Sequence, residues 1–200
     1  MRAARLVKRL IDIVAALVLL ILSGPVMIWA ICAIRRDSPG PAVFRQTRIG
    51  LGGRRFQIYK LRTMRDGAQA EWKAPLAEDF DSYVFQVPDD PRITRIGAYL
   101  RRTSIDELPQ LLNVLKGDMS LIGPRPEIPE MVALYKASMH RRHQVKPGIT
   151  GLAQVSGRGS LTTGEIMVYD LRYSDKWSLR LDCWILKETV RQVFAGQEAR

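Results

Sequence analysis

The chain begins with a short basic segment that is followed by a long apolar run. Residues 13–34, IVAALVLLILSGPVMIWAICAI, are 22 residues without a charge. As an α-helix this run would extend about 33 Å, close to the thickness of a bilayer core. The run exceeds the 7 to 15 apolar residues typical of a signal peptide, and no small-residue cleavage site follows it. The pattern therefore predicts a membrane-associated chain.

Basic residues flank the apolar run on both sides: Arg2, Arg5, Lys8 and Arg9 precede it, and Arg35 and Arg36 follow it. Because basic flanks favour the cytoplasmic side, both ends are predicted to lie there. Ser23-Gly24-Pro25 in the middle could bend a re-entrant helix, since proline lacks an N–H donor and a serine hydroxyl can satisfy the freed carbonyl. A kinked single-pass anchor fits the same residues equally well.

Beyond Arg36 no apolar run is long enough to span a bilayer. AVFRQTRIG (42–50) and RRFQIYKLRTM (54–64) are predicted to pair as a β-hairpin, with Gly50, Gly52 and Gly53 at its turn. Residues 66–91 are acidic and interrupted by prolines, which suggests a helix with a loop. That this segment closes over a substrate as a lid is a hypothesis.

Two later segments, residues 128–143 and 177–194, place large apolar side chains at helical spacing among basic residues. Packing on a protein core is the ordinary explanation for either segment. However, Trp and Arg side by side near a membrane anchor, as in WSLRLDCWILKETVRQVF, are typical of helices at the lipid headgroup level. Both interpretations stay open for each segment.

Charge adds a constraint on the partners of the protein. The 200 residues include 31 Lys and Arg but 20 Asp and Glu, a net charge of +11. A balance of this kind implies polyanionic partners: nucleic acid, anionic lipid or phosphorylated substrates. Cys32 and Cys183 lie far apart, with Cys32 inside the apolar run, so a disulfide framework or a cysteine metal cluster is not expected.

Two adjacent carboxylates, Asp106 and Glu107, stand in SIDELPQLLNVLKGDMSLIGPRPE (104–127). Helix capping is one explanation, with Asp106 as the N-cap or Ser104 and Glu107 as a capping box. Phosphoryl transfer is the other, because it needs cations around the phosphate and carboxylates that hold Mg²⁺ or attack phosphorus. The nearby cations are Lys60, Arg62, Arg65, Arg95, Arg101, Arg102 and Arg125. The usual nucleotide-binding motifs, namely the Walker loop, the Rossmann fingerprint and the kinase signature, are missing.

Taken together, these motifs resemble the bacterial sugar transferases, the monotopic phosphoglycosyl transferases. The similar segments run in order along nearly the whole chain: KRLIDI, the apolar run broken at Pro25, DSPGPAVFRQTRIG, FQIYKLRTM, DPRITRIGAYLRRTSIDELPQLLNVLKGDMSLIGPRPE, KPGITGLAQVSGR and YDLRYSDKWSLRLD. The length is similar to that of the minimal catalytic unit of this family. In one departure, glycine precedes Pro25 where the family commonly has serine, which leaves the role of the Ser23 hydroxyl in doubt.

The resemblance implies a reaction and its partners. A sugar 1-phosphate would pass from a UDP-sugar to undecaprenyl phosphate, with release of UMP, through a covalent aspartyl intermediate on Asp106. The reaction would be the first membrane step of glycoconjugate assembly. Mg²⁺ would be the cofactor, held by Glu107 together with Asp106, and Arg125 would meet the nucleotide end. Further phosphate or nucleotide contacts would come from Lys60, Arg62, Arg101 and Asp170, the last also a candidate supporting acid.

The resemblance also implies an architecture. We expect a mostly helical α+β fold with two parts. Residues 1–36 would form a re-entrant membrane helix broken at Ser23-Gly24-Pro25, and residues 37–200 a catalytic domain with interfacial helices and a short hairpin. The domain would lie on the cytoplasmic face of the bacterial inner membrane, in contact with lipids.

A non-catalytic scaffold that grips anionic lipid or polyanions is the alternative function. Nucleic acid is not an expected partner, because the aromatic residues group with apolar ones rather than with a basic patch. A hydrolase that delivers the same intermediate to water is a further rival. The sugar, the glycan pathway and the oligomeric state are not readable from the sequence.

Overall fold

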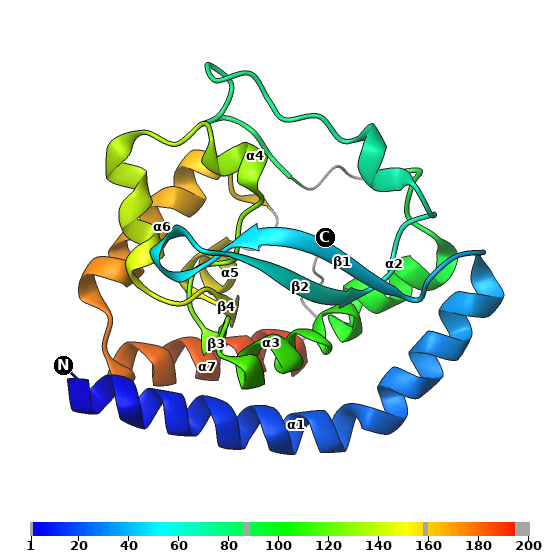
Figure 1. The fold of residues 1–200 in the computed structure, drawn as a ribbon, viewed down its shortest axis with the longest axis horizontal. Coiled ribbons are helices and arrows are strands. Elements are labelled where there is room, and N and C mark those ends of the chain that lie inside the picture. Colours follow the sequence, from blue (N-terminus) through cyan, green and yellow to red (C-terminus); the bar gives the residue numbers. More distant parts are fainter. Residues whose placement is uncertain (1, 86–88, 158–159, 195–200) are drawn as a thin grey trace.

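In the computed structural model, which describes residues 2–85, 89–157 and 160–194, the apolar run and its basic flanks form one helix, α1 (Arg2–Asp37). The helix continues through Pro25, so the expected break is a bend within an unbroken helix, visible along the lower edge of Figure 1. Ser23 Oγ donates to the carbonyl of Leu20 at 3.5 Å, whereas proline at position 25 frees the carbonyl of Ile21. The Ser23 hydroxyl therefore does not satisfy the freed group.

Helix α1 is long and apolar enough to cross a membrane, with a mean hydropathy of 2.5 and only 11% of its apolar stretch buried. A core helix of a soluble protein would be mostly buried. The buried stripe of α1 is narrow and consists of Asp12, Ala16, Ala30 and Ile34. Ala16 packs in a cluster with β2 and α3, and Ala30 and Ile34 pack in a second cluster with Leu100. Both halves of α1 therefore lie against the domain.

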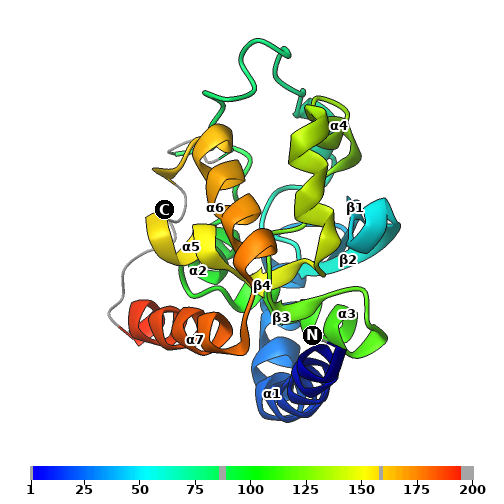
Figure 2. The ribbon, with the colours of Figure 1, turned by 90° about the vertical axis from the view of Figure 1, so that its left-hand side faces the viewer.

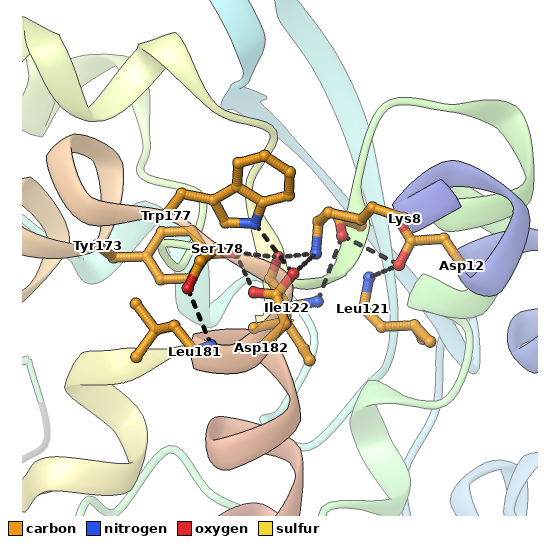
Figure 3. A network of polar contacts seen from close by, with 10 residues as sticks. Lys8, Asp12, Leu121, Ile122, Tyr173, Trp177, Ser178, Leu181 and Asp182 are labelled. Carbon is orange, nitrogen blue, oxygen red and sulfur yellow. Dashed lines mark hydrogen bonds and ion pairs between the residues drawn. The ribbon is translucent and has the colours of Figure 1, made fainter. Parts of the chain in front are cut away.

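Polar contacts fix the first half of α1 to the domain, as Figure 3 shows. Lys8 Nζ donates to Asp182 Oδ2 at 2.8 Å and to the carbonyl of Ile122 at 3.1 Å. The buried Asp12 carboxylate accepts from Ser120 Oγ and from the Leu121 amide, both at 3.0 Å. These charges face the domain, while the opposite face of α1 stays apolar and exposed.

The predicted hairpin is confirmed. Strands β1 (Val43–Ile49) and β2 (Arg55–Leu61) pair antiparallel, with Val43 opposite Leu61 and Ile49 opposite Arg55. Gly52 and Gly53 adopt positive φ angles of 64° and 77° at the turn, a conformation that glycine tolerates best. A second small sheet pairs β3 (Ser120–Ile122) with β4 (Gly148–Thr150) in parallel.

Helices α2 (Arg95–Arg102) and α3 (Gln110–Lys116) connect the hairpin to β3. The rest of the described chain forms α4 (Pro129–Val132), η4 (Ala137–Gln144), α5 (Leu152–Gly157), α6 (Thr163–Lys176) and α7 (Leu179–Phe194). The described residues are thus mostly helical with small sheets, as expected. Figures 1 and 2 place α1, α3 and α7 on one side of the molecule and α4 with α6 farther from it.

The two amphipathic segments have different outcomes. Residues 128–143 form the short α4 and most of η4, and Met131 and Met139 are buried in a cluster with Phe80 and Met167, so the interfacial interpretation is wrong there. Helix α7 instead buries Ile185 and exposes Trp184, Leu186, Val190 and Val193. The helix itself lies on the same side of the molecule as α1 (Figure 2). The Phe194 side chain lies outside the described part.

The acidic segment 66–91 contains a single short turn of 3₁₀ helix, η2 (Ala68–Glu71), among its described residues, rather than the expected helix. Phe80 anchors it in the core, and the Tyr83 carbonyl accepts from the Thr163 amide at 2.8 Å. Residues 86–88 lie outside the described part. A lid role for this segment stays a prediction.

Candidate active site

The acidic pair occupies a tight turn, η3 (Ile105–Glu107), between α2 and α3. Ser104 before it has a positive φ of 56°, an uncommon conformation for a non-glycine residue that marks strain. Neither capping arrangement forms, because the Ser104 side chain makes no capping bond and α3 begins after Pro109. The two carboxylates are therefore not helix caps.

Glu107 is held by two cations from separate parts of the chain. Lys60 on β2 donates to Glu107 Oε1 at 2.8 Å, and Arg125 donates to the same oxygen at 2.7 Å. Burial alone would raise the pKa of Glu107, but Arg125 and Lys60 hold it below its usual value. The Arg125 side chain remains 46% exposed, so its guanidinium can meet a ligand while it contacts Glu107.

Asp106 has a different environment. Its side chain is buried, and none of the described residues donates a hydrogen bond to its carboxylate. Burial raises the pKa of Asp106, and the neighbouring Glu107 charge raises it further, while Lys60, Arg125 and Arg101 act against this. A carboxylate with cations nearby but no hydrogen-bond donor is free to act as a nucleophile.

Arg101 approaches the pair from α2 and donates to Thr63 Oγ1 at 2.9 Å. Helix α2 lies close to the end of β2 because residue 97 is glycine: a Cβ there would lie 1.9 Å from the Thr63 carbonyl oxygen. Burial lowers the pKa values of Arg101 and Lys60. Three cations, Lys60, Arg101 and Arg125, thus face two carboxylates, a balance that favours an incoming anion.

Arg62 does not join this cluster. Its side chain is buried and donates to the backbone carbonyls of Ser38 at 2.8 Å and of Pro39, which ties the start of the hairpin to the chain after α1. Asp170 does not join it either. It lies on α6, 1% exposed, in an ion pair with Arg142. The structure gives both residues supporting positions behind the site.

Asn113 is a residue that the sequence analysis did not single out. Its fully buried side chain accepts from the Tyr59 amide at 3.1 Å and donates to the Gln57 carbonyl at 2.7 Å, so α3 is bonded to the edge of β2. This contact sets the spacing between Lys60 on β2 and the acidic turn before α3. The signal was an asparagine within an otherwise apolar helical stripe, LLNVL.

The donor set suits a metal that is shared with a substrate. Among the described residues, no three His, Cys, Asp or Glu side chains come together as a protein metal cage. Mg²⁺ in phosphoryl transfer sites is commonly bound by one or two carboxylates plus substrate phosphates and water. Asp106 and Glu107 fit that pattern.

Comparison with known proteins gives consistent matches. A family model described as bacterial sugar transferase matches residues 3–196. The UDP-glucose:undecaprenyl-phosphate glucose-1-phosphate transferase of Caulobacter vibrioides is 46% identical over 98% of this chain and 73% of its own length. The galactosyl transferase CpsE of Streptococcus agalactiae is 44% identical over 96% of this chain and 43% of its own length. The undecaprenyl-phosphate galactose phosphotransferase of Salmonella typhimurium is 41% identical over 96% of this chain and 41% of its own length. The chain thus spans less than half of the latter two proteins.

Proposed function

The chain belongs to the bacterial sugar transferase family, and we propose that it transfers a sugar 1-phosphate from a UDP-sugar to undecaprenyl phosphate in polysaccharide biosynthesis. The observation that carries this proposal is the contact of Glu107 with Lys60 and Arg125, directly beside the buried Asp106. The relatives named above use glucose in one case and galactose in the others, so family membership does not fix the sugar.

The proposed reaction has two displacements at the same phosphorus atom. An Asp106 carboxylate oxygen attacks the β-phosphorus of the UDP-sugar, the bond to the bridging oxygen breaks, and UMP leaves with the electron pair. The sugar phosphate is then an acyl phosphate on Asp106. A phosphate oxygen of undecaprenyl phosphate attacks the same phosphorus and displaces the carboxylate, which regenerates the enzyme.

The cations of the site support both displacements. Arg125, with its exposed guanidinium, would bind the leaving UMP phosphate, since a guanidinium can donate two parallel hydrogen bonds to a phosphate. Lys60 from β2 and Arg101 from α2 both lower the pKa of Asp106 and would neutralise charge that develops on the phosphoryl oxygens. Glu107 keeps Lys60 and Arg125 in place.

Asp106 and Glu107 would hold Mg²⁺ together with the substrate diphosphate. When bound, Mg²⁺ supplies charge neutralisation that reduces repulsion between a carboxylate nucleophile and the phosphates. Glu107 suits this role because its pKa is below the usual value, so it is ionised throughout the physiological range. Asp106 would share the ion before attack.

The membrane part of the proposal is a re-entrant α1 with the domain on the cytoplasmic face. Support comes from both ends of the helix. Near the N-terminus Lys8 and Asp12 bind the domain, and at the C-terminus Asp37 accepts from the Ile96 amide at 3.3 Å. A helix whose two ends contact one domain keeps both ends on the same side of a bilayer. In this proposal the site would lie near the lipid headgroups, which the exposed apolar residues of α7 support.

The proposal is tested by UMP release from the purified protein in lipid nanodiscs. Each of several UDP-sugars is supplied with Mg²⁺, with and without undecaprenyl phosphate, and Asp106→Asn is compared with Asp175→Asn, a surface acid. We expect UMP and lipid-linked sugar phosphate from one sugar, loss of both with Asp106→Asn, and no change with Asp175→Asn. Free sugar phosphate without lipid product would indicate a hydrolase. No UMP from any sugar, with a folded membrane-bound protein, would favour the scaffold.

A further inference from the structure

A buried ion pair lies behind the candidate active site. Arg142 on η4 and Asp170 on α6 meet at 2.5 Å between Arg142 Nη2 and Asp170 Oδ2, and their side chains are 3% and 1% exposed. Burying two charges costs desolvation energy, and apolar residues of similar size often pack there with equal or greater stability. A pair of this kind is therefore weak evidence for a stabilising role, and the question is which part of the chain the pair keeps in position.

Arg142 reaches the chain that carries Arg125. Its Nη2 donates to the backbone carbonyl of Arg125 at 2.7 Å, and its Nη1 donates to the Tyr135 hydroxyl. One guanidinium thus connects α6, the segment after α4 and the Pro124-Arg125-Pro126 turn. Lysine has the charge but not the planar fork that makes several directed contacts at once.

Every carbonyl of this turn accepts one directed hydrogen bond. Pro124 accepts from the Gly148 amide at 2.9 Å, and Pro126 accepts from Arg48 at 3.0 Å. The Arg125 carbonyl, in the middle, accepts from Arg142. The two prolines limit the internal shape of the turn, but they do not set its position relative to Glu107.

We propose that the Arg142–Asp170 pair is a positioning unit, which fixes the backbone of the Pro124-Arg125-Pro126 turn and so directs the Arg125 guanidinium to Glu107. The inference rests on the proposed function for its effect on catalysis. Asp170 orients Arg142, Arg142 holds the Arg125 carbonyl, and Arg125 acts in the site. Neither member of the pair contacts Glu107 or Asp106 in the described contacts.

The structure provides a matched control on the same two elements. Arg141 and Asp175 pair at 3.2 Å between η4 and α6, but their side chains are 50% and 41% exposed. Asp175→Asn thus removes the same charge from the same helix without touching the turn. We expect Asp170→Asn to lower kcat/KM for UMP release at least tenfold and Asp175→Asn to change it less than twofold.

A double-mutant cycle separates positioning from general damage. Residues that act through one another are non-additive, whereas independent effects multiply. If Asp170 acts through Arg125, then Asp170→Asn in an Arg125→Ala background should cost less than a further twofold. An equal loss in both backgrounds would overturn the inference. If Asp170→Asn does not fold, Tyr135→Phe removes another acceptor of the same guanidinium and replaces it in the cycle.

A readout without catalysis keeps the inference independent of the proposed function. Hydrogen exchange of a peptide spanning residues 121–132 reports on the turn directly. We expect faster exchange in Asp170→Asn than in Asp175→Asn when each variant is measured at the same interval below its own melting temperature. Unchanged exchange would overturn the inference even in an active enzyme. If the wild-type protein releases no UMP but the exchange differs, the proposed function fails while the positioning of the turn stands.

Discussion

Asp106 and Glu107 are adjacent and chemically similar, yet the structure gives them opposite electrostatic environments. Glu107 is enclosed by Arg125 and Lys60, and its pKa is lowered despite burial. Asp106 has no donor among the described residues, and burial raises its pKa. Environments that push two neighbouring pKa values apart commonly divide two roles between the groups. Here the permanently ionised Glu107 suits the binding of cations, and Asp106 suits nucleophilic attack on phosphorus.

The pH dependence of the reaction should report on Asp106. A protonated carboxyl cannot attack phosphorus, so activity should be lost as the pH falls through the raised pKa of Asp106, above the ordinary value of 3.8. The check is the acid limb of kcat/KM for UMP release. Arg101→Gln removes a cation that favours the ionised form and should move this limb to higher pH, whereas Asp175→Asn should not. An acid limb unaffected by Arg101→Gln would contradict the assignment.

Single residues also show where spacing misled the sequence analysis. Arg62 stands two positions from Lys60 in YKLRTM and was expected in the same phosphate site. In the structure Lys60 contacts Glu107, while Arg62 is bound to the carbonyls of Ser38 and Pro39. Residues i and i+2 of a strand share a face, but the last strand residue is Leu61, so Arg62 leaves that alternation. The end of a strand is not readable from alternation alone.

Among the elements, α3 is fixed to the hairpin by one polar side chain. Asn113→Leu removes the partners of the Tyr59 amide and the Gln57 carbonyl and leaves both unsatisfied beside a buried site. At about 1 to 3 kcal/mol for each of the two buried groups left unpaired, the loss of stability should be about 2 to 6 kcal/mol. Denaturant unfolding in detergent measures it, with Leu112→Ala on the exposed face of the same helix as the control. A change no larger than that of Leu112→Ala would contradict this account.

Helix α2 depends on a close approach that only glycine allows. Gly97→Ala would place a Cβ 1.9 Å from the Thr63 carbonyl oxygen, so α2 must move and Arg101 must leave Thr63. We expect lower stability and at least a tenfold lower rate of UMP release. Gly24→Ala is the matched control, because a Cβ there meets nothing within 4 Å and alanine favours helix. Equal behaviour of the two variants would show that the close approach is not needed.

Elements differed in how well the sequence predicted them. The hairpin was predictable because alternating side chains and a glycine-rich turn specify it locally. Residues 128–143 were not, because an amphipathic pattern is the same whether its apolar face meets lipid or a protein core, and Met131 and Met139 meet Phe80 and Met167. The pattern shows that one face of the segment is buried. Only the tertiary packing shows whether that face meets lipid or a protein core.

For the whole molecule, the site exists because three distant segments meet. Lys60 comes from β2, Asp106 and Glu107 from the turn before α3, and Arg125 from the turn after β3. The residue types could be listed from the sequence, but their contact depends on long-range packing such as Asn113 against β2 and Arg142 against Arg125. Arg142 was missed for this reason: within HRRH, nothing distinguishes the buried Arg142 from the exposed Arg141.

The arrangement of α1 against the domain makes a prediction about membrane topology. Its N-terminal half is bound through Lys8 to Asp182 and its C-terminus through Asp37 to Ile96, so both ends should face the side on which the domain lies. In a variant with Cys32→Ser and Cys183→Ser, single cysteines are introduced as Ala3→Cys, Arg36→Cys or Asp175→Cys. A membrane-impermeant maleimide should label all three in inside-out vesicles and none in intact right-side-out vesicles. For a single-pass helix, Ala3→Cys would instead be labelled from the side opposite to Asp175→Cys, and the contacts of Lys8 with the domain could not exist in the membrane.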